Sequence, residues 1–283
     1  MSGEPFRDRV AVVTGGASGI GQALCRELGR RGAIVVVADI QHEAAEQVAA
    51  EIERSGGRAA AAHVDVSRQE SVDSMVGDAV ARHGRLDYMF NNAGVAASGD
   101  ARDLTLEHWR HVVDVNLWGV IYGTLAAYPV MVRQQGGHVV NTASVTGLVP
   151  FPGGLPYAAT KHAIVGLSTS LRAEAAELGV KVSVACPGFV ESNIYQAGVV
   201  VNVSREAWNE KLFFKKMDVA KAAGAILRGV ARNRGIIVFP MHARLLWWAQ
   251  RVHPRLLAPL GRKAVRLLRE VRGQGEPPAA SPP

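Results

Sequence analysis

Short runs of apolar, mostly β-branched residues alternate with longer helix-like stretches over residues 10–240. Seven of these runs predict strands, at 9–14, 33–39, 59–64, 86–91, 138–143, 181–186 and 235–239. The runs are continuously apolar, and the intervals between them are long enough for crossover helices. Strands of this kind indicate a parallel sheet that is covered by helices on both faces. We therefore predict a doubly wound α/β fold.

Residues 189–217 interrupt the alternation with an irregular stretch that includes Trp208, Phe213 and Phe214. A long loop inside a compact domain is usually functional, so we expect a lid over a site. Asp218 then has the character of a helix N-cap, and a helix is predicted over 219–233.

Two helix-like pieces follow the last predicted strand, at 241–252 and 260–272, separated by Pro254 and Pro259. The second piece has an apolar face opposite a basic face. The apolar face holds Leu260, Ala264, Leu267, Leu268 and Val271, and the basic face holds Arg262, Lys263, Arg266 and Arg269. In the first piece a shared face holds Met241, Leu245, Trp248 and Val252, while Trp247 points elsewhere.

These patterns divide the chain into one domain (1–240), a basic amphipathic helical extension (241–272) and a tail (273–283). The tail is dominated by Pro, Gly, Ala and Ser, which predicts disorder.

Net charge is unevenly distributed along the chain, whose total is +7. Residues 1–240 contain 24 basic and 23 acidic side chains, a balance of +1, whereas 241–283 contain eight and two, a balance of +6. The apolar face of the basic extension either packs on the domain or a sister subunit, or lies on an anionic membrane surface. Both alternatives stay open. Nucleic acid is not an expected partner, because the basic residues lack interleaved aromatic side chains and a known binding motif.

The two cysteines, Cys25 and Cys186, lie in separate apolar stretches without metal-ligand spacing, so both are expected to be core residues. No metal site is predicted. Two cysteines without a predicted disulfide, and no secretion signal before the first apolar run, favour a cytoplasmic protein. The protein would be peripheral to a membrane if 241–272 binds lipid.

A glycine-rich turn, Thr14–Gly21, follows the first strand and opens the first helix. Gly15, Gly19 and Gly21 let the backbone turn tightly and approach a pyrophosphate at the helix N-terminus. Asp39 ends the second strand, where its carboxylate would reach the hydroxyls of an adenosine ribose. This arrangement predicts a Rossmann-type dinucleotide site.

The same carboxylate bears on the choice of cofactor, because it would repel a 2′-phosphate. Positions where a compensating arginine would stand hold Ser18, Ile40 and Gln41. The sequence therefore favours NAD over NADP.

Tyr157 and Lys161 are four residues apart and would share one face of a helix. A tyrosine has an ordinary pKa of about 10, and bringing it near neutrality requires about 4 kcal/mol of preferential stabilisation of the phenolate. An adjacent ammonium and an oxidised nicotinamide can supply that stabilisation. Such a tyrosine exchanges a proton with a hydroxyl while hydride passes to or from the nicotinamide.

In combination these motifs resemble the short-chain dehydrogenase/reductase family, over about residues 8–240. The residues that carry the resemblance are Thr14–Gly21, Asp65, Asn91–Gly94, Asn116, Ser144, Tyr157–Lys161 and Pro187–Gly188, in that order. The resemblance implies a catalytic set of Asn116, Ser144, Tyr157 and Lys161. In it Ser144 steadies the substrate oxygen, and Asn116 holds a water near the lysine.

The resemblance also implies the cofactor-binding residues, which are Gly15, Ser18, Gly19, Ile20, Gly21, Asp39, Ile40, Asp65, Val66, Asn92, Ala93, Gly94, Tyr157, Lys161, Pro187, Gly188, Val190 and Ser192. One position departs from the family, since Ser192 stands where threonine is usual. Its hydroxyl is retained, so the contact with the carboxamide is expected to survive. The family further implies a homodimer or homotetramer.

The substrate pocket is expected to involve Val145, Leu148, Phe151, Leu155, Tyr195 and the 189–217 stretch. These residues are mostly apolar, and no arginine is placed to hold a carboxylate or phosphate. We therefore expect a hydrophobic secondary alcohol or ketone as substrate. The alternative is a non-catalytic nicotinamide-dinucleotide-binding sensor or scaffold.

Overall fold

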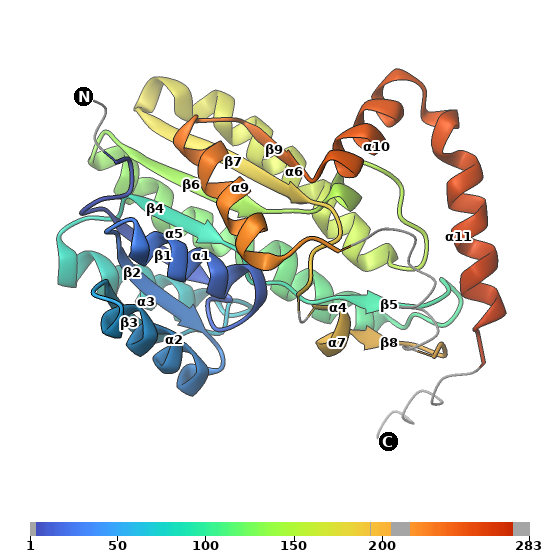
Figure 1. Ribbon diagram of the computed structural model, residues 1–283, viewed down its shortest axis with the longest axis horizontal. Coiled ribbons are helices and arrows are strands. Elements are labelled where there is room, and N and C mark those ends of the chain that lie inside the picture. Colours follow the sequence, from blue (N-terminus) through green and yellow to red (C-terminus); the bar gives the residue numbers. More distant parts are fainter. Residues whose placement is uncertain (1–3, 193, 205–215, 274–283) are drawn as a thin grey trace.

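The computed structural model describes residues 4–192, 194–204 and 216–273. Its main sheet has seven parallel strands in the order β3-β2-β1-β4-β6-β7-β9 (Figure 1). The strands are β1 (Val10–Thr14), β2 (Ile34–Asp39), β3 (Arg58–His63), β4 (Tyr88–Asn91), β6 (Gly137–Thr142), β7 (Val180–Pro187) and β9 (Ile236–Phe239). Each overlaps one of the seven predicted strands, so the doubly wound α/β prediction is confirmed.

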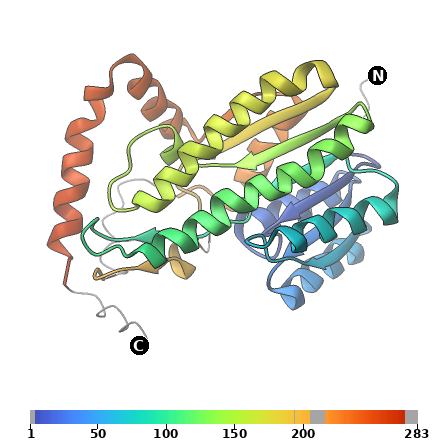
Figure 2. The same cartoon turned by 180° about the vertical axis from the view of Figure 1, so that it is seen from behind.

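Helices cover both faces of the sheet (Figures 1 and 2). One layer consists of α1 (Gly19–Arg30), α2 (His42–Arg54) and α9 (Val219–Ala231), and the other of α3 (Gln69–His83), α4 (Leu106–Val113), α5 (Gly119–Arg133) and α6 (Leu155–Ala175). Along β1, Ala11 and Val13 pack into the first layer, while Val10 and Val12 pack into the second. A strand buried on both sides needs apolar residues at every position, which explains its continuous hydrophobicity.

The strand order reverses at β1, which pairs with β2 on one side and β4 on the other. Doubly wound sheets bind ligands at this switch point, outside the carboxyl ends of the strands.

The 189–217 stretch, expected to be irregular, contains two short elements, α7 (Ile194–Ala197) and β8 (Val199–Val200). Strand β8 pairs with β5 (Ala97–Ser98) in a separate two-stranded sheet. These elements are too short to produce a periodic pattern, which is why the sequence did not reveal them. Trp208, Phe213 and Phe214 lie outside the described residues. Asp218 caps α9 as predicted, because its Oδ1 accepts from the Lys221 N–H (3.0 Å).

The run Leu106–Arg133 joins α4, a π-helical turn (Asp114–Trp118) and α5. Length and composition alone would let it cross a membrane, and 39% of its most apolar window is buried. Here it covers the sheet and packs against α3 and α6.

The extension forms α10 (Met241–Val252), a 3₁₀ turn (Pro254–Leu257) and α11 (Ala258–Glu270), so α11 begins earlier than expected, with Pro259 in its first turn. Leu268 of α11 and Val271, the C-cap of that helix, are buried against Val203. Two ion pairs hold its end, Arg269–Asp100 (3.2 Å) and Arg272–Asp103 (2.7 Å). Of the two alternatives for the extension, α11 therefore packs on the domain. Of the expected tail, only Gly273 is described.

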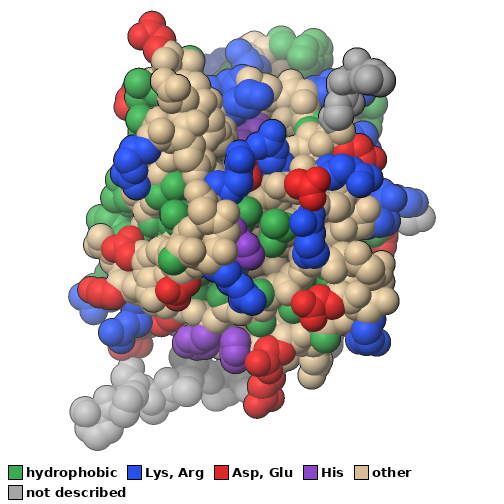
Figure 3. All heavy atoms as spheres, turned by 90° about the vertical axis from the view of Figure 1, so that its left-hand side faces the viewer, with side chains coloured by type: hydrophobic (Ala, Val, Ile, Leu, Met, Phe, Trp, Pro, Cys, Tyr) green, Lys and Arg blue, Asp and Glu red, His purple; other side chains and the backbone are tan. Residues whose placement is uncertain are grey.

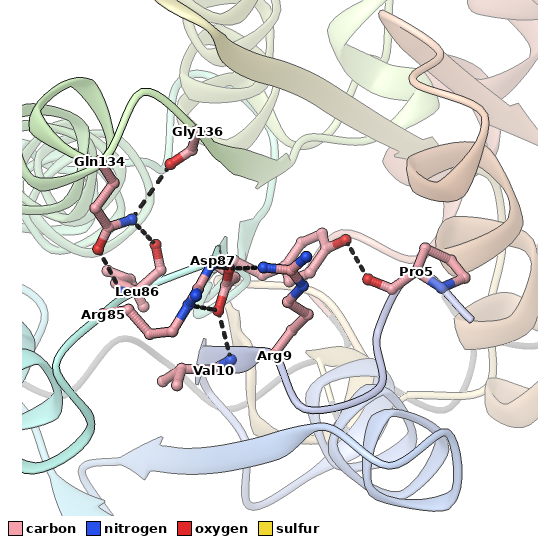
Figure 4. Close-up of polar contacts among 9 residues, drawn as sticks. Pro5, Arg9, Val10, Arg85, Leu86, Asp87, Gln134 and Gly136 are labelled. Atoms are coloured by element: carbon pink, nitrogen blue, oxygen red, sulfur yellow. Dashed lines mark hydrogen bonds and ion pairs between the residues drawn. The ribbon is translucent and has the colours of Figure 1, made fainter. Parts of the chain in front are cut away.

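On the side of the molecule away from α10 and α11, acidic and basic side chains are interspersed (Figure 3). At the amino ends of the central strands, Asp87 joins β4 to β1 (Figure 4). Its carboxylate accepts from the Val10 N–H (2.9 Å), Arg9 (3.1 Å) and Arg85 (2.6 and 2.8 Å). This cluster is structural, because it lies at the opposite end of the sheet from the switch point.

Candidate active site

A cavity lies at the carboxyl ends of the central strands, beside the switch point. Among the residues predicted for the site, those that line it are Gly15, Ser18, Gly19, Ile20, Asn92, Ala93, Gly94, Ser144, Tyr157, Lys161, Pro187, Gly188, Val190 and Ser192. They come from segments far apart in the sequence, which the parallel sheet aligns at one edge.

The glycine turn forms one wall of the cavity, with Gly15 and Gly19 at positive φ (64° and 52°). A Cβ on Gly21 would stand 1.9 Å from the Gly15 carbonyl oxygen, so only glycine fits there. Ser18 occupies the N-cap of α1 without a side-chain capping bond, and the first turn holds no acidic residue. The helix therefore presents its first N–H groups uncapped, which suits a phosphate anion.

Asp39 lies at the end of β2 and is 8% exposed. Its two carboxylate oxygens accept from the N–H groups of Ala17 and Gln41, each at 3.0 Å. The first of these bonds ties the carboxylate to the glycine turn. Asp39 does not itself line the cavity, and the neighbouring Ile40 is 61% exposed.

Tyr157 and Lys161 occupy the first two turns of α6, and Ser144 follows β6 directly, as the spacing predicted. The Ser144 hydroxyl lies close enough to Tyr157 to favour the phenolate and lower the pKa of Tyr157. Burial outweighs that effect and raises the pKa of Tyr157 to about 12. The protein's own groups therefore keep this tyrosine protonated at neutral pH.

Lys161 is 2% exposed, and its Nζ donates to the Thr142 carbonyl oxygen (2.8 Å). Nζ lies 5.4 Å from the centre of the Tyr157 ring. Burial lowers the pKa of Lys161 to about 8. Lys161 is therefore protonated at neutral pH but loses its charge as the pH rises through about 8, and in this structure it does not bring the pKa of Tyr157 toward neutrality.

Asn116 sits in the π-helical turn between α4 and α5 and is fully buried. Its side-chain amide bonds both backbone groups of Val95 (2.8 and 2.9 Å). Asn116 and Lys161 both lie close to Gly94, since a Cβ there would stand 3.2 Å from the Asn116 Oδ1 and 3.5 Å from the Lys161 Nζ. Asn116 thus holds the segment beside the lysine without lining the cavity itself, and π-helical turns are frequent at functional sites.

Other predicted residues also lie behind the cavity wall. Asp65 accepts hydrogen bonds from Ser67, and Val66 packs against Gly119. Val145 and Phe151 line the cavity, whereas Leu148 and Leu155 do not. The Tyr195 side chain is outside the described part of the structure.

Sequence reasoning missed several residues that build the site. The residues that were not predicted include Ala96, Ser98, Thr142, Ala143 and Thr146, whereas Phe189, Ile194, Val199 and Val200 line the cavity from the 189–217 stretch, as expected. Cys186, expected to be a core residue, lies close enough to Tyr157 and Lys161 to affect both pKa values. Burial raises its own pKa to about 12, so the thiol is inert. Only the strand-end position of Thr142 and Cys186 hinted at these roles.

The cavity floor is held by a polar network around Asn92. Its N–H and side-chain amide donate to Thr14 (3.0 Å each), and Thr142 donates to its side-chain oxygen (3.4 Å). Among the described residues, no group of three or more His, Cys, Asp or Glu is placed to hold a metal.

A sequence profile of the short chain dehydrogenase family matches residues 9–199. Meso-2,3-butanediol dehydrogenase of Serratia marcescens is 33% identical over 81% of this chain and 89% of its own length. Cyclohexanol dehydrogenase of Acinetobacter sp. (strain SE19) is 37% identical over 66% of this chain and 75% of its own. Among solved structures, a short chain dehydrogenase/reductase from Burkholderia phymatum in complex with NAD aligns with a TM-score of 0.78 and 27% identity. The alignment covers 97% of this chain and 99% of that one.

Proposed function

This chain belongs to the short chain dehydrogenase family of oxidoreductases, and on that premise we propose that it uses NAD(H) to interconvert a hydrophobic secondary alcohol and its ketone. The observation that supports this most strongly is the placement of Tyr157, Ser144 and Lys161 in one cavity beside the glycine turn. A protein that only bound a dinucleotide would have no need of that set.

The glycine turn and the uncapped start of α1 fit a pyrophosphate, because a side chain at Gly21 would collide with backbone. Asp39 would accept from the ribose hydroxyls and repel a 2′-phosphate, which favours NAD. When bound, the nicotinamide accepts or donates the hydride and, in its oxidised form, adds a positive charge near Tyr157.

Tyr157 exchanges the proton with the substrate oxygen, and Ser144 donates a hydrogen bond that steadies charge on that oxygen. Lys161 supplies a fixed positive charge that favours the phenolate. Thr142 and the Asn116 turn position the lysine and the segment beside it.

The substrate side of the cavity supports an apolar substrate. Apolar side chains from separate segments line it, among them Val145, Phe151, Phe189 and Ile194. Among the described lining residues Lys161 is the one cation, and it is committed to Thr142. An anionic substrate would find no second cation there.

The proposal is tested by turnover of cyclohexanol and meso-2,3-butanediol with NAD⁺ and with NADP⁺, chosen because relatives act on these alcohols. NADH formation on at least one hydrophobic secondary alcohol, faster with NAD⁺, is the expected result. NADH binding without turnover on a broad panel of alcohols and ketones would favour a sensor or scaffold instead.

We also propose that the chain forms a homodimer or homotetramer through α5. Trp118 and Leu125 are 44% and 60% exposed, and Trp118 stacks on Tyr122 along the same helical run. Light scattering should give a mass of two or four chains, which Leu125→Arg lowers; a monomeric wild type would contradict this assembly.

A further inference from the structure

A long C-terminal segment of the chain carries positive charge and no negative charge. Between Val219 and Arg269 the sequence contains no Asp or Glu and eleven Lys or Arg side chains. This segment comprises α9, the edge strand β9, α10 and most of α11 (Figure 1). It contrasts with the opposite side of the molecule, where both signs are mixed (Figure 3).

An apolar stripe runs along the outer face of α10, defined by Met241, Leu245, Trp248 and Val252. Their exposed fractions are 64%, 60%, 63% and 58%. Leu256, in the following turn, is 57% exposed and extends the stripe. Spacings of four, three and four residues place these side chains on one face of the helix.

The opposite face of α10 already attaches the helix to the domain. Ala243 is fully buried, and Leu246 and Trp247 pack into the same cluster as Val238 and Ile164. Trp247 therefore lies on a different face of α10 from the stripe, as the sequence predicted. The stripe is therefore not needed to hold α10 in place.

Four arginines surround a hollow next to the stripe, which we call the arginine pocket: Arg228 and Arg232 of α9 and its cap, Arg234 before β9, and Arg244 of α10. No ion pair joins any of them to a described carboxylate. Guanidinium groups arranged in this way suit a phosphate, which accepts several charge-assisted hydrogen bonds.

Arg244 connects the two features, because it lines the arginine pocket and lies between Met241 and Leu245 in the sequence of α10. Its Nε donates to the Val238 carbonyl oxygen (2.8 Å), which fixes the side chain against β9. Farther along the helix, Arg251 stacks over Trp247 (5.4 Å). Both guanidinium groups are thus held on the side of α10 that faces the domain, next to the residues that anchor the helix.

We propose that the stripe and the arginine pocket together dock this protein on an anionic phospholipid surface. The apolar side chains enter the boundary between headgroups and acyl chains, and the arginine pocket receives a lipid phosphate. A second copy of this chain fits less well, because a two-fold pairing of this face would bring arginines against arginines. A nucleic acid would leave the aliphatic stripe in water.

Docking at this face would place the active-site cavity next to the lipid. The start of α10 packs on the cavity wall, where His242 and Ala243 lie against Gly188, and His242 lies 6.2 Å from Phe189 between ring centres. Gly188 and Phe189 both line the cavity. The docking itself does not depend on the redox activity proposed above.

Flotation of the full chain with vesicles tests the proposal. The protein should float with vesicles that mix phosphatidylglycerol and phosphatidylcholine, and stay behind with pure phosphatidylcholine. Leu245→Glu with Trp248→Glu should abolish flotation, while secondary structure and NADH binding are kept. Arg232→Ala with Arg234→Ala should weaken partitioning by about 25-fold, since each arginine near an anionic surface contributes about fivefold.

Matched controls use exposed side chains elsewhere in the molecule. Leu106→Glu with Leu178→Glu, and Arg54→Ala with Arg82→Ala, should float like the wild type. Absence of flotation with anionic vesicles, equal flotation with neutral ones, or normal flotation of the stripe variant would each overturn the proposal. Two further results would overturn the proposal if the protein binds no vesicle. One is a dimer that the stripe variant abolishes, and the other is glycerol phosphate bound at the arginine pocket.

Discussion

The Nζ of Lys161 lies 5.4 Å from the centre of the Tyr157 ring and donates its hydrogen bond to the backbone of Thr142. The lysine is thus fixed by the sheet, independently of the tyrosine. Burial raises the pKa of Tyr157 to about 12, and Lys161 does not reverse this. Under the proposed function, alcohol oxidation would need the positive charge of an oxidised nicotinamide, whereas ketone reduction would start from a tyrosine that is already protonated.

This relationship predicts opposite pH dependences for the two directions. The rate of alcohol oxidation should rise with pH, because Tyr157 must lose its proton, and the rate of ketone reduction should fall. Profiles of kcat/KM in both directions check this. An oxidation rate that does not change from neutral to alkaline pH would contradict it.

Asp39→Asn should reduce the preference for NADH over NADPH by about 10- to 100-fold, because a charge-assisted hydrogen bond to the ribose is lost along with the repulsion of a 2′-phosphate. The amide oxygen can still accept from Ala17 or Gln41, so the fold is preserved. Fluorescence titration with both nucleotides measures the ratio. An unchanged ratio would show that the ribose is recognised elsewhere.

Gly21→Ala should prevent dinucleotide binding, because the new Cβ would stand 1.9 Å from the Gly15 carbonyl oxygen and force the turn apart. Gly77→Ala is the matched control, since a Cβ there meets nothing within 4 Å in the middle of α3. That control should bind NADH normally and raise the free energy of unfolding by about 0.4–1 kcal/mol. Normal NADH affinity in Gly21→Ala would refute this account of the turn.

His138 makes stability depend on pH. It is 3% exposed, contacts the Ser183 hydroxyl at 2.8 Å, and burial lowers its pKa to about 3. In the unfolded chain His138 has its ordinary pKa of about 6.5, so below that pH it is protonated in the unfolded chain but stays neutral in the folded chain. The free energy of unfolding should therefore fall as pH drops from about 6.5 toward 3, by about 1.4 kcal/mol per pH unit.

Urea unfolding between neutral pH and about pH 5 separates this effect from that of Glu27. The pKa of Glu27 is lowered from 4.5 to about 2, so Glu27 loses its stabilising contribution only when the pH falls below about 4.5. The pKa values of His83 and His242 are lowered too, so His138→Gln is the necessary comparison. That variant should show a shallower loss of stability on acidification. An identical slope would rule His138 out as the source.

Much of the fold was accessible from the sequence because buried parallel strands leave a strong local pattern. Seven apolar runs became seven strands, and the four-residue spacing of Tyr157 and Lys161 placed both on α6. The glycine turn Thr14–Gly21 was equally predictable from local sequence. Gly15 and Gly19 adopt positive φ, and Gly21 leaves no room for a Cβ.

What escaped sequence reasoning depends on contacts between distant segments. The β5–β8 pair joins residues about a hundred positions apart through two residues each, which no periodic pattern marks. The anchoring of Lys161 by Thr142 and of Asn116 by Val95 are main-chain contacts that side-chain identity does not predict. Leu148 and Leu155 were expected in the pocket from their position along the chain, yet neither lines the cavity.

The most direct test of the central claim compares wild type with Tyr157→Phe, measuring NADH affinity and alcohol turnover on the same preparations. We expect NADH binding within a few-fold of wild type and turnover lower by about 10²- to 10⁴-fold, because the phenyl ring keeps the packing but has no proton to exchange. Turnover close to that of the wild type would contradict the role assigned to Tyr157.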